Sequence, residues 1–231
     1  TGYYEPLVNV SNSKDNIFKF PILKENKNYF KKPRAFIEKN FNLKDVILWT
    51  DDPINLFFLQ IQGSGIGEFQ DKKRIRIGYA GNNDLKYTSI GKILLKKKYI
   101  KYGDINLFSI KDWLRKNPQL SKGIMNQNER YIFFRKSNEK ISTQVSGALG
   151  VPLKPNFSIA VDKNIYPLGL PFIIEIYRDK SILPAVSMDT GAAIVGTNRA
   201  DLFLGRGEIA EQKAGKLKKK IFLYTLIPYN E

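Results

Sequence analysis

The sequence predicts a mainly β protein with few, short helices. Short segments that are apolar, or that alternate basic and apolar residues, recur along the chain, as strands do. Turn residues separate these segments, and the chain contains 17 glycines and 11 prolines. Hydrophobic residues make up 42% of the 231 residues, which is enough to bury the core of one large or two small domains.

Six segments are predicted as strands. Residues 55–62 are apolar enough for a buried strand and end in the turn sequence 63–65, Gly-Ser-Gly. Residues 74–79 alternate basic and apolar side chains, the period-two pattern of a half-exposed strand. The other predicted strands are 131–135, 170–177, 183–188 and 220–227.

Two segments are predicted as helices. Residues 89–98 begin at Ser89, a good capping residue, and end in lysines, which suit the negative end of the helix dipole. Residues 109–114 carry the Ser-x-x-Asp capping spacing before an apolar face. The pair Asn117-Pro118 is expected to end this second helix.

The formal net charge is +16, which could indicate a nucleic-acid partner. Basic residues form runs at 96–98 and 216–220, but lysine dominates and the excess is spread along the chain. A solvated basic surface is therefore the favoured interpretation, and no nucleic acid is expected. Such a surface would also suit an anionic polysaccharide or a cell wall.

The chain contains no histidine and no cysteine. This excludes a Ser-His-Asp triad, a Cys-His dyad, a zinc ribbon and a disulfide framework, and leaves carboxylate, Lys or Tyr chemistry or oxygen-ligated metals. No apolar run approaches the roughly 20 residues that span a bilayer, and no export signal opens the sequence. Residue 1 lies inside a motif, so we expect the natural N-terminus to be missing.

The segment 188–207 sets two carboxylates, Asp189 and Asp201, among small residues; Asp162 is a third candidate. Like charges that share a partly buried site raise at least one pKa, and a protonated Asp can act as a general acid and then as a base. Asp189-Thr190-Gly191 could equally be a structural Asx turn. The same tripeptide marks aspartic proteases, which here would require a homodimer.

Six motifs in order resemble the membrane-bound lytic murein transglycosylase A (MltA) family, which ends in a "3D" domain named for three aspartates. They are 1–6, 59–65, 78–83 with 87–91, 131–135, 147–153 and 189–207. The resemblance implies a double-psi β-barrel catalytic domain, mapped to 1–8 and 105–231, with a smaller β-rich domain inserted at 9–104. The glycan would bind in a groove between them.

The implied activity is that of a peptidoglycan lytic exotransglycosylase, a lyase of the MurNAc-GlcNAc β-1,4 bond that leaves a 1,6-anhydro ring. Family matching assigns Asp201 as the acid/base, with Asp189 and Asp162 in support. A non-catalytic glycan-binding protein of the same fold is the main alternative. The implied substrate-binding residues are Thr1, Tyr3, Gln62, Gly63, Ser64, Tyr79 and Asn82.

The resemblance implies no metal or organic cofactor and a monomer that binds peptidoglycan glycan strands, with other cell-wall enzymes as further candidate partners. It places the full-length protein in the periplasm, attached to the outer membrane through an N-terminal lipid anchor that this chain does not contain. Two departures from the family pattern lie near the aspartates. Ala192 stands where glycine is usual, and Leu204 where tryptophan is common.

Overall fold

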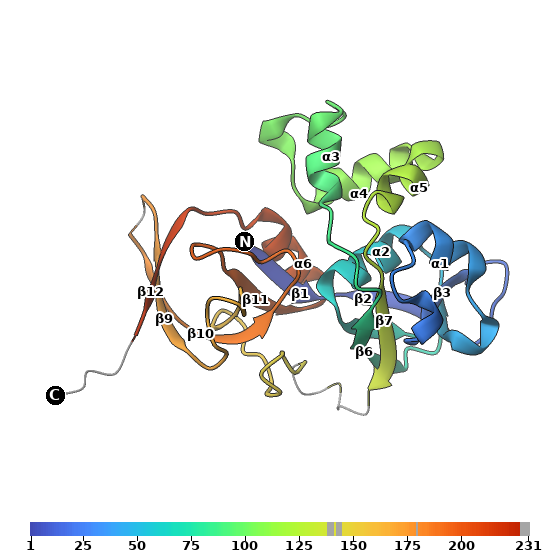
Figure 1. Cartoon of the computed structure of the whole chain (residues 1–231), viewed down its shortest axis with the longest axis horizontal. Coiled ribbons are helices and arrows are strands. Elements are labelled where there is room, and N and C mark those ends of the chain that lie inside the picture. The colour runs from blue at the N-terminus through green and yellow to red at the C-terminus, as the bar shows by residue number, and fades with distance from the viewer. Residues whose placement is uncertain (138–140, 142–144, 179, 227–231) are drawn as a thin grey trace. The chain divides into compact units, whose positions relative to one another are not determined.

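The structure, a computed structural model, describes residues 1–137, 141, 145–178 and 180–226. The chain divides into two compact units (Figure 1). Unit 1 consists of Thr1–Glu5 together with Ser142–Glu231, and unit 2 consists of Pro6–Ile141. Each unit contains one six-stranded sheet, so the prediction of a mainly β protein with short helices is confirmed.

The sheet of unit 1 has the strand order β1-β11-β8-β10-β9-β12. Two neighbouring pairs, β1 with β11 and β8 with β10, are parallel, and the others are antiparallel. Strands β1 and β12 are the two edge strands and, in the described residues, do not pair with each other, so the sheet is open. The strands are β1 (Gly2–Glu5), β8 (Ser158–Val161), β9 (Pro171–Ile176), β10 (Ile182–Thr190), β11 (Asp201–Arg206) and β12 (Ile221–Thr225).

Apolar side chains from the central strands form the core of unit 1, with Ile159, Val161, Phe172 and Ile174 among its buried members. Helix α6 (Gly207–Lys216) follows β11 and packs against β1 and β11. The predicted strands at 170–177, 183–188 and 220–227 are confirmed as β9, β10 and β12, although residue 227 lies outside the described residues.

The sheet of unit 2 has the strand order β3-β4-β2-β5-β6-β7. Its strands are β2 (Leu7–Ser11), β3 (Phe20–Leu23), β4 (Val46–Thr50), β5 (Gly65–Glu68), β6 (Arg74–Asn82) and β7 (Ile132–Ser137). Its helices are α1 (Arg34–Asn40), α2 (Pro53–Gln62), α3 (Ile90–Lys96), α4 (Leu107–Lys116) and α5 (Pro118–Asn126), with 3-10 turns at Lys27–Tyr29, Leu43–Asp45 and Tyr102–Asp104. The predicted strands at 74–79 and 131–135 are confirmed as β6 and β7.

The prediction of a strand at 55–62 is wrong, because this segment forms helix α2. Asp52 caps the helix: its Oδ1 accepts hydrogen bonds from the backbone N–H of Ile54 at 2.7 Å and of Asn55 at 3.2 Å. Pro53 occupies the first turn, where its missing N–H costs nothing. Gly63 ends the helix in the left-handed conformation, with φ 83°.

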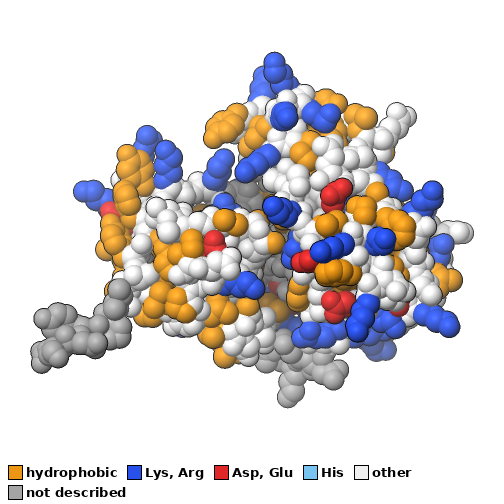
Figure 2. Space-filling model, viewed as in Figure 1, with side chains coloured by type: hydrophobic (Ala, Val, Ile, Leu, Met, Phe, Trp, Pro, Cys, Tyr) orange, Lys and Arg blue, Asp and Glu red, His pale blue; other side chains and the backbone are white. Residues whose placement is uncertain are grey.

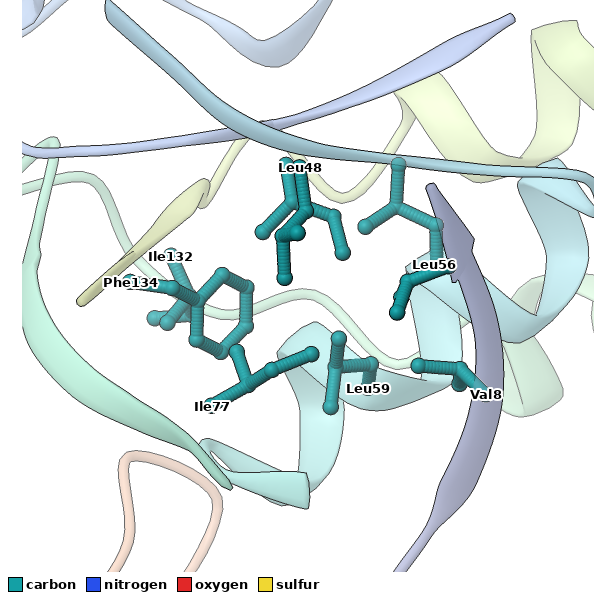
Figure 3. Packing of buried hydrophobic residues seen from close by; sticks show 9 residues of the cluster. Val8, Leu48, Leu56, Leu59, Ile77, Ile132 and Phe134 are labelled. Atoms are coloured by element: carbon teal, nitrogen blue, oxygen red, sulfur yellow. The ribbon is translucent and has the colours of Figure 1, made fainter. Parts of the chain in front are cut away.

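The apolar pattern of helix α2 resembles that of a buried strand because the helix is buried on two sides. Leu56 and Leu59 pack into the sheet core around Leu48, Ile77 and Phe134 (Figure 3). Side chains on its other side pack into a second core with α3, α4 and α5. A helix that is apolar nearly all round shows no amphipathic period, and a short apolar run does not distinguish a helix from a strand.

Both predicted helices are present, with one change of cap. Ser89 caps α3 as expected, accepting from the backbone N–H of Lys92 at 3.4 Å. Helix α4 begins earlier than predicted, at Leu107, because Asn106 is its cap and Ser109 completes a capping box from inside the first turn. Pro118 does not only end α4; it is also the first residue of α5, a helix that the sequence patterns did not predict.

The compact units have bounds that differ from the predicted domains 1–8 with 105–231 and 9–104. Residues 105–137 lie in unit 2 because α4 and α5 share a core with α2, and β7 pairs with β6. The segment from Pro6 also belongs to unit 2, since β2 pairs with β4 and β5. Among the described residues, no helix is long and apolar enough to cross a membrane.

Candidate active site

Three aspartates gather at one end of the unit 1 sheet. Ala160 of β8 is the register partner of Asp189 on β10 and also of Asp201 on β11. Since neighbouring strands lie about 4.8 Å apart, the Cα atoms of these two aspartates are separated by about 10 Å. Asp162 follows directly after the last residue of β8. The strand pairing therefore brings together the three residues that were predicted to form the catalytic site.

Asp201 is the first residue of β11, and its side chain is 14% exposed. The hydroxyl of Thr1 donates a hydrogen bond to its Oδ1 at 2.6 Å. Thr1 lies beside it because β1 pairs in parallel with β11, so the first residue of the sequence contacts a carboxylate 200 positions later. Thr1, one of the predicted substrate-binding residues, thus contacts the carboxylate of Asp201 directly.

Arg199 also holds Asp201, and sequence reasoning did not assign it a role. Its Nη2 forms an ion pair with Oδ1 of Asp201 at 3.0 Å and donates to the hydroxyl of Thr1 at 3.2 Å. In the described structure Asp201 shares no hydrogen bond with Asp189 or Asp162, the two residues predicted to support it. A basic residue two positions before the aspartate was the available signal for this contact.

Asp189 lies near the end of β10 and accepts three hydrogen bonds. The backbone N–H groups of Ala148 and Thr190 donate to its Oδ1, at 3.0 Å and 2.9 Å. The hydroxyl of Tyr3 donates to its Oδ2 at 3.0 Å. Burial raises the pKa of the Asp189 carboxyl above its usual value, and these three donors oppose that shift.

Tyr3 connects β1 to the site and also belongs to the core. Its ring packs against Phe203 with centroids 5.3 Å apart, and its hydroxyl points to Asp189. Burial raises the pKa of the Tyr3 phenol far above its usual value, and the nearby Asp189 adds to the shift. Tyr3 therefore stays protonated and acts as a hydrogen-bond donor to Asp189.

The loop that contains Gly147 and Ala148 supports Asp189 from outside the sheet. Leu149 N–H donates to the carbonyl of Met188 at 3.1 Å, so the loop lies directly on the strand backbone. A Cβ on Gly147 would approach that same carbonyl more closely than van der Waals contact allows. The motif 147–153 was recognised from the sequence, but the contact of the Ala148 amide with Asp189 was not predicted.

Asp162 is buried, and its carboxylate accepts hydrogen bonds from two loop amides. Its Oδ1 accepts from the backbone N–H of Asn164 at 3.0 Å, and its Oδ2 accepts from that of Gly196 at 2.9 Å. The Gly196 amide, followed by the Asn164 amide, lowers the pKa of the Asp162 carboxyl below its usual value. These bonds tie the segment that joins β10 to β11, and thus the segment leading to Asp201, to the end of β8.

Replacing Asp162 with Ala is expected to lower the melting temperature by several degrees at neutral pH, because two loop amides lose their acceptor. A lowered pKa means that the ionised carboxylate stabilises the fold at pH values above the unfolded-state pKa of about 3.9. This stabilisation is lost as the pH falls through the lower folded-state pKa. Thermal melts should therefore show the difference at pH 7 and a smaller one below pH 3. An unchanged difference at both pH values would contradict this assignment.

The remaining predicted binding residues lie in unit 2. Gln62 ends helix α2, Gly63 is its C-cap, and Ser64 leads into β5; all three are partly buried. Tyr79 on β6 is 43% exposed, and the side-chain amide of Asn82 donates to its hydroxyl at 2.7 Å. Tyr79 and Asn82 thus form an exposed pair in which an aromatic ring lies beside an amide.

The neighbouring Asn83 has a structural role. It is fully buried, and its side chain donates to the carbonyls of Lys32 at 2.7 Å and Glu129 at 2.8 Å. Its Oδ1 accepts from the backbone N–H of Tyr131 at 2.8 Å. These bonds fix the end of β6, where the Tyr79–Asn82 pair is exposed.

The two departures from the family pattern fit the described structure. Ala192 is absent from the residues with positive φ, so its Cβ causes no backbone strain. Leu204 lies over Gly2: its Cδ1 would be 2.6 Å from a Cβ added at that glycine. No group of three or more acidic side chains in the described residues is placed to hold a metal ion.

Comparison with known proteins gives concordant matches. Residues 1–135 match the MltA specific insert domain, and residues 157–227 match the 3D domain. The chain is 35% identical to a membrane-bound lytic murein transglycosylase A homolog of Buchnera aphidicola, over 94% of this chain and 62% of that protein. It is 29% identical to membrane-bound lytic murein transglycosylase A of Vibrio cholerae, again over 94% and 62%.

Solved structures agree with these matches. A membrane-bound lytic murein transglycosylase from Agrobacterium tumefaciens has a TM-score of 0.89 and 28% identity, covering 99% of this chain and 73% of that one. Escherichia coli MltA with bound chitohexaose has a TM-score of 0.85 and 27% identity, covering 97% and 71%. The chain spans 62% of the length of the curated relatives named above.

Proposed function

Since the chain belongs to the MltA family, we propose that it acts as a peptidoglycan lytic transglycosylase, which cleaves the β-1,4 bond between N-acetylmuramic acid and N-acetylglucosamine without water. The observation that carries the proposal is the register that sets Asp189 and Asp201 on either side of Ala160, with Asp162 at the end of the same strand. The names of the relatives and the chitohexaose bound to the E. coli protein support a glycan substrate.

In the proposed mechanism Asp201 serves first as acid and then as base. Its carboxyl proton passes to the glycosidic oxygen as the bond from C1 breaks, which leaves an oxocarbenium-like sugar. The resulting carboxylate then takes the proton of the C6 hydroxyl, whose oxygen bonds to C1 and closes the 1,6-anhydro ring. Asp201 regains its proton and no water is consumed. One carboxyl group suffices because the substrate supplies its own nucleophile.

The neighbours of Asp201 would set its orientation during both steps. Thr1 and Arg199 contact its two oxygens, which restricts the rotation of the carboxyl group. Asp189 and Asp162 keep supporting roles: the first fixes Tyr3 and the 147–148 loop, and the second fixes the segment before β11. Both supporting aspartates are themselves held by backbone amides.

The two compact units are also proposed to correspond to the two domains of the family. Unit 1 would be the catalytic domain of double-psi barrel type, and unit 2 would be its inserted domain. The order of segments supports this, because the two pieces of unit 1 flank unit 2 in the sequence. Periplasmic location with outer-membrane association belongs to the same proposal, and the relatives' description as membrane-bound supports it.

The Tyr79–Asn82 pair is proposed to bind a sugar of the glycan. Replacing Tyr79 with Ala is expected to weaken binding of chitohexaose by about fivefold to tenfold, because the exposed aromatic face is lost and the Asn82 amide loses the hydroxyl that orders it. Calorimetric titration of the catalytically inactive Asp201→Asn protein measures this directly. Tyr177→Ala, another half-exposed tyrosine but in unit 1, is the matched control and should bind normally. Equal affinities of both variants would contradict the assignment.

Digestion of purified murein sacculi, followed by mass analysis of the soluble products, tests the proposed function. We expect muropeptides that end in 1,6-anhydromuramic acid. Products that end in reducing muramic acid, which are heavier by one water, would show hydrolysis and would overturn the mechanism. Binding to sacculi without release of any product would instead support the non-catalytic glycan-binding alternative.

A further inference from the structure

A second aromatic surface lies in the helical part of unit 2. A pocket of about 310 Å³ opens between the segment 99–104 and helix α4. Tyr99 and Trp113 form its aromatic wall, and Lys101 and Asp104 contribute polar groups. Neither the proposed catalytic residues nor the Tyr79–Asn82 pair lines this pocket.

The aromatic wall is held in place by the core beneath it. The rings of Tyr99 and Trp113 stack with centroids 5.0 Å apart and an angle of 13° between their planes. Leu114, next to Trp113 on α4, is fully buried in the core that joins α2, α3, α4 and α5. Tyr99 remains 43% exposed. A rigid aromatic face that is open to solvent needs little ordering when a ligand binds.

The pocket also holds polar groups that lack partners. In the described part of the chain, the carboxylate of Asp104 and the ammonium of Lys101 have no hydrogen-bond or ion-pair partner. By contrast, Asp112 and Lys116, which also line the pocket, form an ion pair with each other at 2.9 Å. Asp104 can therefore accept a hydrogen bond from a ligand hydroxyl, and Lys101 can donate one.

We propose that this pocket is a second saccharide-binding site, which takes one N-acetylated hexosamine unit of a glycan strand. An aromatic wall with a few convergent polar groups is typical of small-ligand sites, and its volume is near the lower end of their range of roughly 300–1,000 Å³. A single sugar ring is thus a better match than a longer segment. The inference rests on the proposed function only for the identity of the glycan.

A negatively charged membrane surface is the competing occupant. Lys and Arg side chains gather over α3 to α5 at the top of Figure 2, and such clusters attract anionic lipids. Two carboxylates, Asp104 and Asp112, line the pocket itself, however. Lys101 and Lys116 line it too, so the pocket carries no formal net charge, which suits an uncharged sugar better than an anionic lipid headgroup.

Trp113 provides a local reporter of binding. The chain has two tryptophans, and the other, Trp49, is only 6% exposed. In the double variant Trp49→Phe, Asp201→Asn, fluorescence therefore reports on Trp113 alone and no turnover occurs. Titration with chitotetraose is expected to give a saturable change with a Kd of about 1 mM. Cellotetraose, which lacks the acetamido groups, should bind more weakly.

Two further variants in this background separate the pocket from its surroundings. Asp104→Ala should weaken chitotetraose binding about fivefold, because the free carboxylate acceptor is lost. Tyr102→Ala, which removes a neighbouring side chain that is 78% exposed and outside the pocket, should bind as the parent does. A titration without saturation, or equal affinities of the two variants, would overturn the proposal.

Vesicles with a high content of phosphatidylglycerol test the competing occupant. A Trp113 response to these vesicles in the absence of any response to chitotetraose would also overturn the saccharide site. The outcome is independent of catalysis, since the titration uses an inactive variant. If Trp113 responds to chitotetraose while the wild-type protein releases no anhydro products from sacculi, the proposed function fails and the binding site stands.

Discussion

Asp201→Asn is expected to reduce the release of anhydromuropeptides from sacculi by about 10²- to 10⁴-fold, the range typical of a lost general acid and base. Asparagine has nearly the same shape, and its oxygen can still accept the hydrogen bond that Thr1 donates to Asp201 at 2.6 Å. It has no proton to give to the glycosidic oxygen and no carboxylate to receive one. The rate of anhydromuropeptide release, measured at a saturating concentration of sacculi, tests this prediction.

Two further variants serve as controls for the activity loss expected in Asp201→Asn. Asp71→Asn removes an exposed carboxylate in unit 2 whose ion-pair partner, among the described residues, is Lys73 at 2.9 Å, and it should keep wild-type activity. Asp189→Asn should lose less activity than Asp201→Asn, since an amide can accept from the Ala148 and Thr190 amides and donate to Tyr3. If Asp189→Asn proved the more damaging, the acid/base role would pass to Asp189, whose pKa burial raises.

Gly147→Ala is expected to have the next largest effect. The added methyl group would collide with the carbonyl of Met188, which is backbone and cannot turn aside. The loop would have to move away from β10, and Ala148 would lose its hydrogen bond to Asp189. We expect a loss of about 1–3 kcal/mol in the free energy of unfolding and about tenfold lower activity. Denaturant unfolding and sacculus digestion measure the two effects.

Gly123→Ala is the matched control for this glycine substitution. Gly123 lies inside helix α5, and a Cβ there meets nothing within 4 Å. Alanine should therefore stabilise the protein by about 0.5–1 kcal/mol, with unchanged activity. Wild-type stability and activity in Gly147→Ala would show that the loop does not depend on close contact with β10.

Local sequence patterns predicted five of the twelve described strands, β6, β7, β9, β10 and β12, and two of the six α-helices, α3 and α4. The alternation in 74–79 identified β6, because half-exposed strands alternate between the core and solvent. The same kind of pattern failed at 55–62, where helix α2 is buried between two cores. The sequence does contain the start and stop signals of this helix, which are Asp52, Pro53 and Gly63. As evidence for a helix, these signals outweigh the apolar run.

The sequence by itself identified the family and narrowed the candidate catalytic groups. Without histidine or cysteine, carboxylates are the natural candidates for proton transfer, and the ordered motifs indicate the MltA family. The tertiary structure decided which groups hold each carboxylate: Thr1 and Arg199 at Asp201, Tyr3 and the Ala148 amide at Asp189. Local propensity acts over a few residues, whereas Thr1 reaches Asp201 only through the pairing of β1 with β11. Such strand pairing depends on the packing of the whole sheet, which no local pattern encodes.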